Sequence, residues 1–215
     1  MTEALPSFEA LDRLGRRRLS EHFFLRDFLY SETAIKHGII NAPTNVALAE
    51  EAGSYLCREL LEPLQKRFGR IHIRSAFRSC EVNGLGNKLG LNCARNEANY
   101  ADHIWDRRDS EGNMGATACI VIPEVADSLH QSGEWVQLAW WIHDHLPYSA
   151  LHFFNALNAC NIQWRQNPVR RIDSYAGWQE GDVWRKSGTL TKPGMSNHAG
   201  DHSKLYQQLA KRFPA

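Results

Sequence analysis

The sequence lacks the features that would assign it to several common classes of protein. No apolar run approaches the roughly 20 residues that span a bilayer, and the first residues show no apolar core followed by a small-residue cleavage site. We therefore expect neither a membrane partner nor a secretory signal. Cytoplasmic residence is the resulting expectation.

The chain also has little excess charge and few cysteines. Its 25 lysines and arginines nearly balance 24 aspartates and glutamates, so a net charge of +1 gives no global electrostatic case for nucleic acid or a membrane. Five cysteines without CxxC spacing argue against a disulfide framework and against a structural zinc knuckle. Nucleic acid is therefore a partner that the composition does not favour.

What is present fits one domain of mixed structure. A chain of 215 residues can bury one sizeable core, and apolar spacing predicts a long helix over 44–69. Alternation and turn residues predict strands at 70–77, 117–123, 149–155 and 169–176, helices at 124–133, 134–146 and 201–213, and a loop at 83–102. The pattern predicts an α+β fold, in which a small antiparallel sheet is flanked by helices.

Several segments, in order, resemble one known family. The runs LSEHFFLRDFLYSETAIKHGIINAP, LLEPLQKRFG, IHIRSAFRSCEVN and WIHDHLPYSALHFF are similar to the zinc D-Ala-D-Ala carboxypeptidases. That family contains bacterial and phage peptidoglycan peptidases and shares a fold with the hedgehog domain. The resemblance covers residues 19–175, which leaves an N-terminal extension at 1–18 and a C-terminal tail with a short helix at 176–215.

The resemblance implies a zinc ion held by His, Asp and a second His, a glutamate base and an arginine that grips the substrate. Three protein ligands leave one position for a water, whose pKa the metal lowers to about 7. A carboxylate then moves the proton, and an arginine binds the substrate's carboxylate. The implied origin is bacterial or phage-encoded.

Two of these positions survive in the sequence. Arg78 matches the family arginine, although pairing with Glu81 would also explain it, and His103 matches the first histidine. Cys119 stands where the aspartate belongs, in the frame GATAC, after 15 intervening residues. A cysteine thiolate can bind zinc, but a cysteine at the start of an apolar strand is more often core.

The distal histidine and the base are missing. A match of RRIDSY to the family strand puts Ile172 at the ligand position, with Arg171 and Asp173 beside it as candidate substrate-binding residues. The glutamate position falls on Phe154. His152 lies two residues earlier on the same predicted strand and should face the same way, so His103, Cys119 and His152 form a candidate replacement zinc set.

A site without metal is an alternative. The inserted loop 104–114 could supply Asp106 or Asp109, and the run HIWD pairs His103 with Asp106, which together could perform acid-base chemistry beside Arg78. Against it stands the interpretation that His103 is a hydrogen-bonded pocket histidine and that the aspartates are solvated. Near the C-terminus, His198 and His202 have i,i+4 spacing and could hold a metal, although a capped surface helix also explains them.

Three functions stay open at this point. The first is a divergent hydrolase that acts on a peptide or cell-wall fragment through a rebuilt site, with zinc as cofactor; it comes first because the scaffold and Arg78 are retained. The second is a non-catalytic binding module, a pseudoenzyme without metal, for a small peptide or another anionic ligand. The third is a metal-independent enzyme that acts on a nucleotide or nucleic acid through His103, Asp106 and Arg78.

Overall fold

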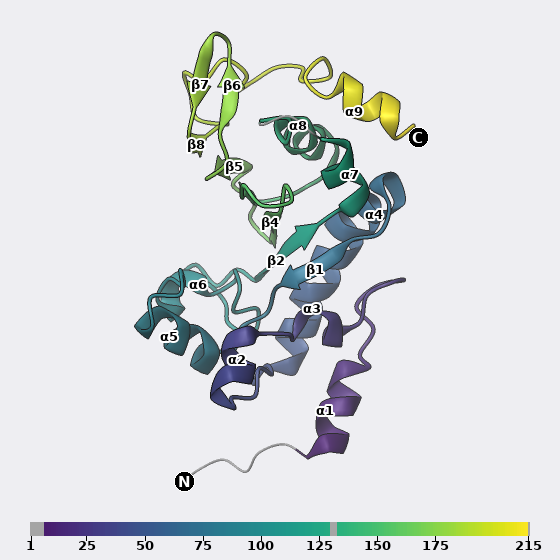
Figure 1. Cartoon of the computed structure of the whole chain (residues 1–215). Helices are drawn as coiled ribbons and strands as arrows, with labels where there is room; N and C mark the ends of the chain where they lie inside the picture. Colours follow the sequence, from purple (N-terminus) through teal and green to yellow (C-terminus); the bar gives the residue numbers. More distant parts are fainter. Residues whose placement is uncertain (1–6, 130–132, 215) are drawn as a thin grey trace.

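The computed structural model describes residues 7–129 and 133–214, and it shows a mixed α+β fold (Figure 1). The helical elements are α1 (Phe8–Gly15), η1 (Leu25–Phe28), α2 (Glu32–His37), α3 (Val46–Leu56), η2 (Cys57–Leu61), α4 (Glu62–Phe68), α5 (Cys80–Lys88), α6 (Asn96–Asn99), α7 (Pro123–Ser128), α8 (Val136–His145) and α9 (Gln207–Arg212). The strands are β1 (His72–Ser75), β2 (Gly115–Val121), β3 (Ala150–Phe153), β4 (Cys160–Arg165), β5 (Arg171–Ser174), β6 (Trp178–Glu180), β7 (Val183–Arg185) and β8 (Gly188–Thr189). The predicted α+β class is confirmed.

The predicted long helix is confirmed as a rod made of α3, η2 and α4. It starts at Asn45, whose side chain accepts a hydrogen bond from the Leu48 amide, and ends at Gly69, whose φ of 91° few other residues adopt. Its centre, η2, widens into a π-turn just before Pro63. Proline has no N–H and its ring clashes with the carbonyl four residues earlier, so this widening is a local accommodation of the ring.

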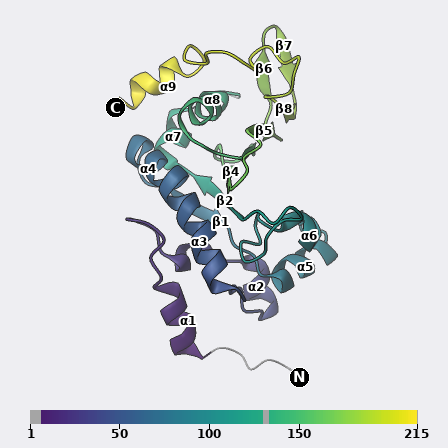
Figure 2. The ribbon, with the colours of Figure 1, turned by 180° about the vertical axis from the view of Figure 1, so that it is seen from behind.

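The main sheet has the strand order β1-β2-β4-β3-β5-β8. Neighbouring strands are antiparallel, as predicted, except β3 and β5, which are parallel. The rod lies across one face of the sheet (Figure 2). Ala118, Ile120, Ile162, Leu151 and Ile172 belong to the core, and each is at most 1% exposed.

Other sequence-based boundaries need correction. The predicted loop 83–102 contains most of α5, whose first turn is capped by the Ser79 side chain, and also α6. Strand β4 was not predicted. The helix predicted over 124–133 begins one residue earlier and ends at Ser128, and residues 130–132 lie outside the described residues.

The C-terminal tail is part of the same fold. Strand β8 pairs with β5, and β6 and β7 form a separate two-stranded sheet. Helix α9 lies beside α8 (Figure 1), and its Leu209 is fully buried. Among the described residues, no helix combines the length and apolarity that crossing a membrane requires.

Candidate functional site

A row of polar side chains crosses the sheet on the face opposite the rod. Cys119 on β2 is paired with Asn161 on β4, which is paired with His152 on β3, and His152 is paired with Asp173 on β5. Directly paired residues in a sheet point to the same face. The flanking residues along each strand alternate into the core, so this face carries the polar groups.

A cleft of about 900 Å³ opens over Cys119, Asn161 and His152 of this row. Its walls come from the first residues of α2 and the two before them, the segment between β1 and α5, the loop that follows α5, and the sheet. The chemically distinctive residues of the wall are Glu32, Arg74, Arg78, Asp102, His103, Cys119, His152, Asn161 and Tyr175. The structure therefore gathers the four predicted residues Arg78, His103, Cys119 and His152 in one cleft.

His103 is held in a single orientation by the backbone. Its Nδ1 lies 2.8 Å from the Ala76 carbonyl oxygen, which can only accept, so Nδ1 carries the proton. The Nε2 atom then holds the lone pair and lies 3.5 Å from the side-chain nitrogen of Asn161. Burial lowers the pKa of His103, as does the Arg78 guanidinium, so the neutral ring is favoured.

Arg78 and Arg74 bring positive charge to the cleft. The Arg78 amide donates to the His103 carbonyl at 2.8 Å, and its guanidinium lies 3.4 Å from the Cys93 sulfur. Burial raises the pKa of the Cys119 thiol, although Arg74 and Arg78 oppose that rise. Cys119 therefore presents a protonated thiol at neutral pH in the metal-free protein.

His152 forms an aromatic wall with two neighbours. Its ring lies 4.3 Å from Tyr175 and 5.3 Å from Phe154, between ring centroids. Burial lowers the pKa of His152, and its buried Nε2 has no hydrogen-bond partner in the described structure. This edge of the cleft therefore offers an aromatic surface, beneath which the Nε2 atom of His152 is buried.

The predicted zinc set does not converge. Within residues 7–129 and 133–214, three potential ligand atoms come within 4.8 Å of one another only in the group His143, Asp144 and His202, which could hold a metal. His103, Cys119 and His152 share the cleft without forming such a group. Zinc chemistry of the kind implied by the family resemblance does not fit these residues, and no step through zinc follows for the cleft.

Asp106 lies away from the cleft. Its carboxylate is 3% exposed and accepts hydrogen bonds from the Thr44 amide and hydroxyl at 2.8 and 2.9 Å. Arg107 lies 3.4 Å from the same oxygen. Instead of the catalytic role predicted for it beside His103, Asp106 anchors the chain just before α3.

The residues predicted around the distal ligand position also lie elsewhere. Arg171 and Asp173 form an ion pair of 2.6 Å with each other, Asp173 also accepts from the Thr189 hydroxyl, and neither contributes to the cleft wall. Ile172 is fully buried in the core. The residue that faces His103 is Asn161, which the sequence analysis missed together with strand β4.

The inserted loop 104–114 neither blocks nor equips the cleft, because none of its residues belongs to the cleft wall. Trp105 is fully buried and donates from its ring nitrogen to the Thr117 carbonyl. Asp109 accepts from the Asn113 and Glu111 amides and closes a turn. The loop is thus fixed to the domain by Trp105, whose ring contacts Phe28 and Phe77 in the core.

Comparisons of the chain with protein-family models, with curated proteins and with solved structures give no match. The resemblance to the zinc D-Ala-D-Ala carboxypeptidases consequently stays a prediction that rests on the sequence segments alone. What can be argued about function comes from the geometry of the cleft.

Proposed function

We propose that the cleft is a binding site for a short peptide or a related zwitterion and that it holds the ligand's carboxylate with Arg78 and Arg74, without a catalytic step. The observation that carries the proposal is that the two arginine side chains in the cleft wall form no ion pair with a described carboxylate. Within the described residues, neither guanidinium has a carboxylate oxygen within 4.0 Å, although both belong to the cleft wall. Arginine presents a planar fork of donors that matches a carboxylate.

The charge of the wall favours a ligand with both signs. Glu32 and Asp102 stand in the same wall as the two arginines, and burial favours neutral rings at His103 and His152. The formal charges therefore balance. A peptide end or a free amino acid, with one carboxylate and one ammonium group, matches this balance, whereas a nucleic acid would need a clear excess of positive charge.

The uncharged part of the wall supports contact with a small organic body. The His152 ring stacks on Phe154, Tyr175 contacts both rings at a tilt, and together they can cover an apolar side chain of the ligand. The Nε2 lone pair of His103, a residue of the cleft wall, can accept a hydrogen bond from a ligand N–H group. These contacts fit a peptide better than an inorganic anion.

Hydrolysis has less support. A general base would have to come from the cleft carboxylates, and Asp102 already accepts a hydrogen bond from the Thr117 hydroxyl, while Glu32 is exposed on α2. Asp106 is engaged with Thr44. The hydrolase and the nucleotide-directed enzyme therefore stay predictions from the sequence. Formation of a reaction product from a peptide or from a nucleotide would support one or the other.

Calorimetric titration with D-alanyl-D-alanine and L-alanyl-L-alanine tests the proposal. Loss of a hydrogen bond to a charged group costs about 1.5–3 kcal/mol, so Arg78→Ala should weaken binding about 10–150-fold. Arg95→Ala is the matched control, because Arg95 is exposed and lies outside the cleft wall. Equal affinity in wild type and both variants, or cleavage of a dipeptide by the wild type, would overturn the proposal.

A further inference from the structure

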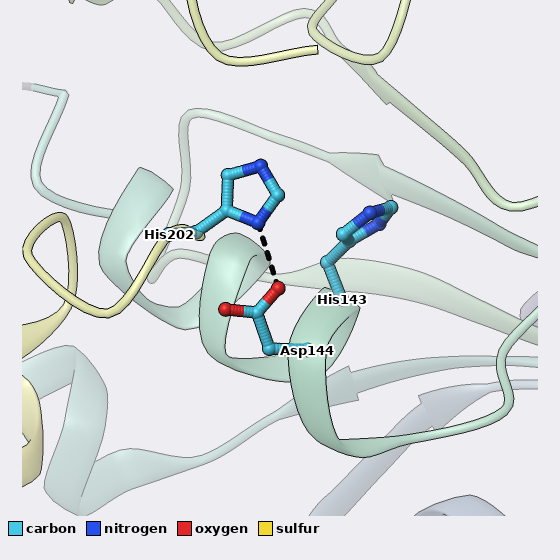
Figure 3. A group of neighbouring side chains, drawn as sticks. All are labelled: His143, Asp144 and His202. Carbon is cyan, nitrogen blue, oxygen red and sulfur yellow. Dashed lines mark hydrogen bonds and ion pairs between the residues drawn. The ribbon is translucent and has the colours of Figure 1, made fainter. Parts of the chain in front are cut away.

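A second cluster of polar side chains lies away from the cleft, where the C-terminal segment meets α8. His143 and Asp144 are on α8, and His202 is 58 residues further along the chain than Asp144. One potential ligand atom from each residue lies within 4.8 Å of the other two (Figure 3). His202 is 3% exposed, so its ring is fixed in place.

The hydrogen bonds of His202 determine where its proton must be. Its Nε2 lies 2.9 Å from the Asn197 carbonyl oxygen, which can only accept, so Nε2 carries a hydrogen. Its Nδ1 lies 2.7 Å from Oδ1 of Asp144. In a neutral ring the Nδ1 lone pair would face a carboxylate lone pair, so the two atoms need a positive charge. A second ring proton supplies it at this distance, and a metal ion bound to both atoms would supply it once they move slightly apart.

The residues around the cluster make hydrogen bonds of the kind that orient metal-binding side chains. The Tyr206 hydroxyl donates to the other Asp144 oxygen at 3.0 Å, and the Tyr148 hydroxyl lies 2.6 Å from Nδ1 of His143. The Trp140 ring stacks on His202 at 4.2 Å. Metal-bound histidines and carboxylates usually have such a partner on the atom that does not bind the metal.

We propose that His143, Asp144 and His202 bind one divalent metal ion of the zinc type, which fastens the C-terminal segment to α8. Two imidazoles and one carboxylate form a donor set that zinc accepts readily, whereas magnesium and calcium prefer oxygen donors. Three protein ligands leave one position for water, and Asp144 is exposed to solvent.

This metal site is independent of the cleft, because none of its three residues belongs to the cleft wall. It is also different from the pairing of His198 with His202 that the sequence indicated. His198 is exposed and its Nδ1 lies 2.9 Å from the Met195 carbonyl. The partner of His202 comes from α8 instead.

The test is zinc loading of the full chain. The protein is stripped with a chelator, incubated with zinc chloride, desalted and assayed by elemental analysis, in the wild type, His202→Ala, Asp144→Asn, His198→Ala and His103→Ala. We expect about one zinc ion per chain in the wild type, in the His198 control and in the cleft variant. We expect less than a tenth of that in His202→Ala and Asp144→Asn.

Asp144→Asn preserves the shape of the side chain, so this variant is expected to fold. Circular dichroism checks that both site variants are folded. Zinc should also raise the midpoint of thermal unfolding of the wild type and leave that of Asp144→Asn unchanged. No zinc in the loaded wild type, or zinc retained by both site variants, would overturn the proposal; the contact would then be an imidazolium–carboxylate pair. Zinc lost only in His103→Ala would also overturn it and would place a metal in the cleft.

Discussion

Replacement of Asp106 separates a structural role from a catalytic one. Its carboxylate receives two short hydrogen bonds from Thr44, one from the amide and one from the hydroxyl, in a place that is 3% exposed. Asp106→Ala removes both bonds and leaves the Thr44 amide without this acceptor. We therefore expect a large loss of stability.

The magnitude follows from the contacts. Each hydrogen bond to a charged group is worth about 1.5–3 kcal/mol. The other carboxylate oxygen of Asp106 is buried without a partner, a cost that the alanine variant relieves. We expect Asp106→Ala to lower the free energy of unfolding by about 3 kcal/mol. Asp106→Asn keeps one acceptor oxygen for Thr44 and should cost about 1–2 kcal/mol.

Urea unfolding at pH 7 measures these differences, with Asp127→Ala as the control. Asp127 is an exposed residue of α7, so the control should stay within about 0.5 kcal/mol of the wild type. Dipeptide binding by the folded Asp106→Asn protein should be unchanged. A stability loss below about 0.5 kcal/mol in Asp106→Ala, or loss of binding at intact stability, would refute the structural role.

Two further predictions concern pH and packing. Burial lowers the pKa values of His103 and His143 in the folded protein. The unfolded chain therefore binds more protons than the folded chain in mildly acidic solution. The contribution of these two histidines to the free energy of unfolding is complete above about pH 6.5 and decreases as the pH drops toward 4. In His103→Asn the side-chain amide can replace the Nδ1 donor but does not titrate. Urea unfolding between pH 7 and 5 should therefore show a smaller decrease of the free energy of unfolding in this variant, and a decrease equal to that of the wild type would contradict the prediction. Gly115→Ala would put a Cβ atom 2.3 Å from the Ala101 carbonyl oxygen and 2.9 Å from that of Trp164, both backbone atoms. We expect it to lower the free energy of unfolding by about 2 kcal/mol or more, and wild-type stability would contradict the close approach.

Regular apolar spacing made much of the fold predictable. The rod from Val46 to Phe68 and strands β1 and β2 follow from apolar residues at helical or alternating positions, and Gly69 ends the rod as expected. Helix α5 was missed because its glycines and asparagines favour turns, whereas a Ser79 cap and packing in the domain hold it helical. Strand β4 was missed although its Cys160, Ile162 and Trp164 alternate into the core.

The site was predictable only where the resemblance marked it. Arg78, His103, Cys119 and His152 share one cleft, but Arg74 and Asn161 reach it through strand register, which the sequence does not state. Asp106 was wrongly predicted to belong to the site, because a residue that is near His103 in sequence can point away from it in space. The contact of Asp144 with His202 joins residues 58 positions apart, and no local pattern indicates it.

The most direct test of the cleft proposal compares one dipeptide with its C-terminal amide. The two ligands differ only in the carboxylate that Arg78 is proposed to hold. In the wild type, the dissociation constant of the amide should exceed that of the free acid at least about tenfold. In Arg78→Ala the ratio should fall toward 1. Equal affinities of the wild type for acid and amide, or an unchanged ratio in Arg78→Ala, would contradict carboxylate recognition by Arg78.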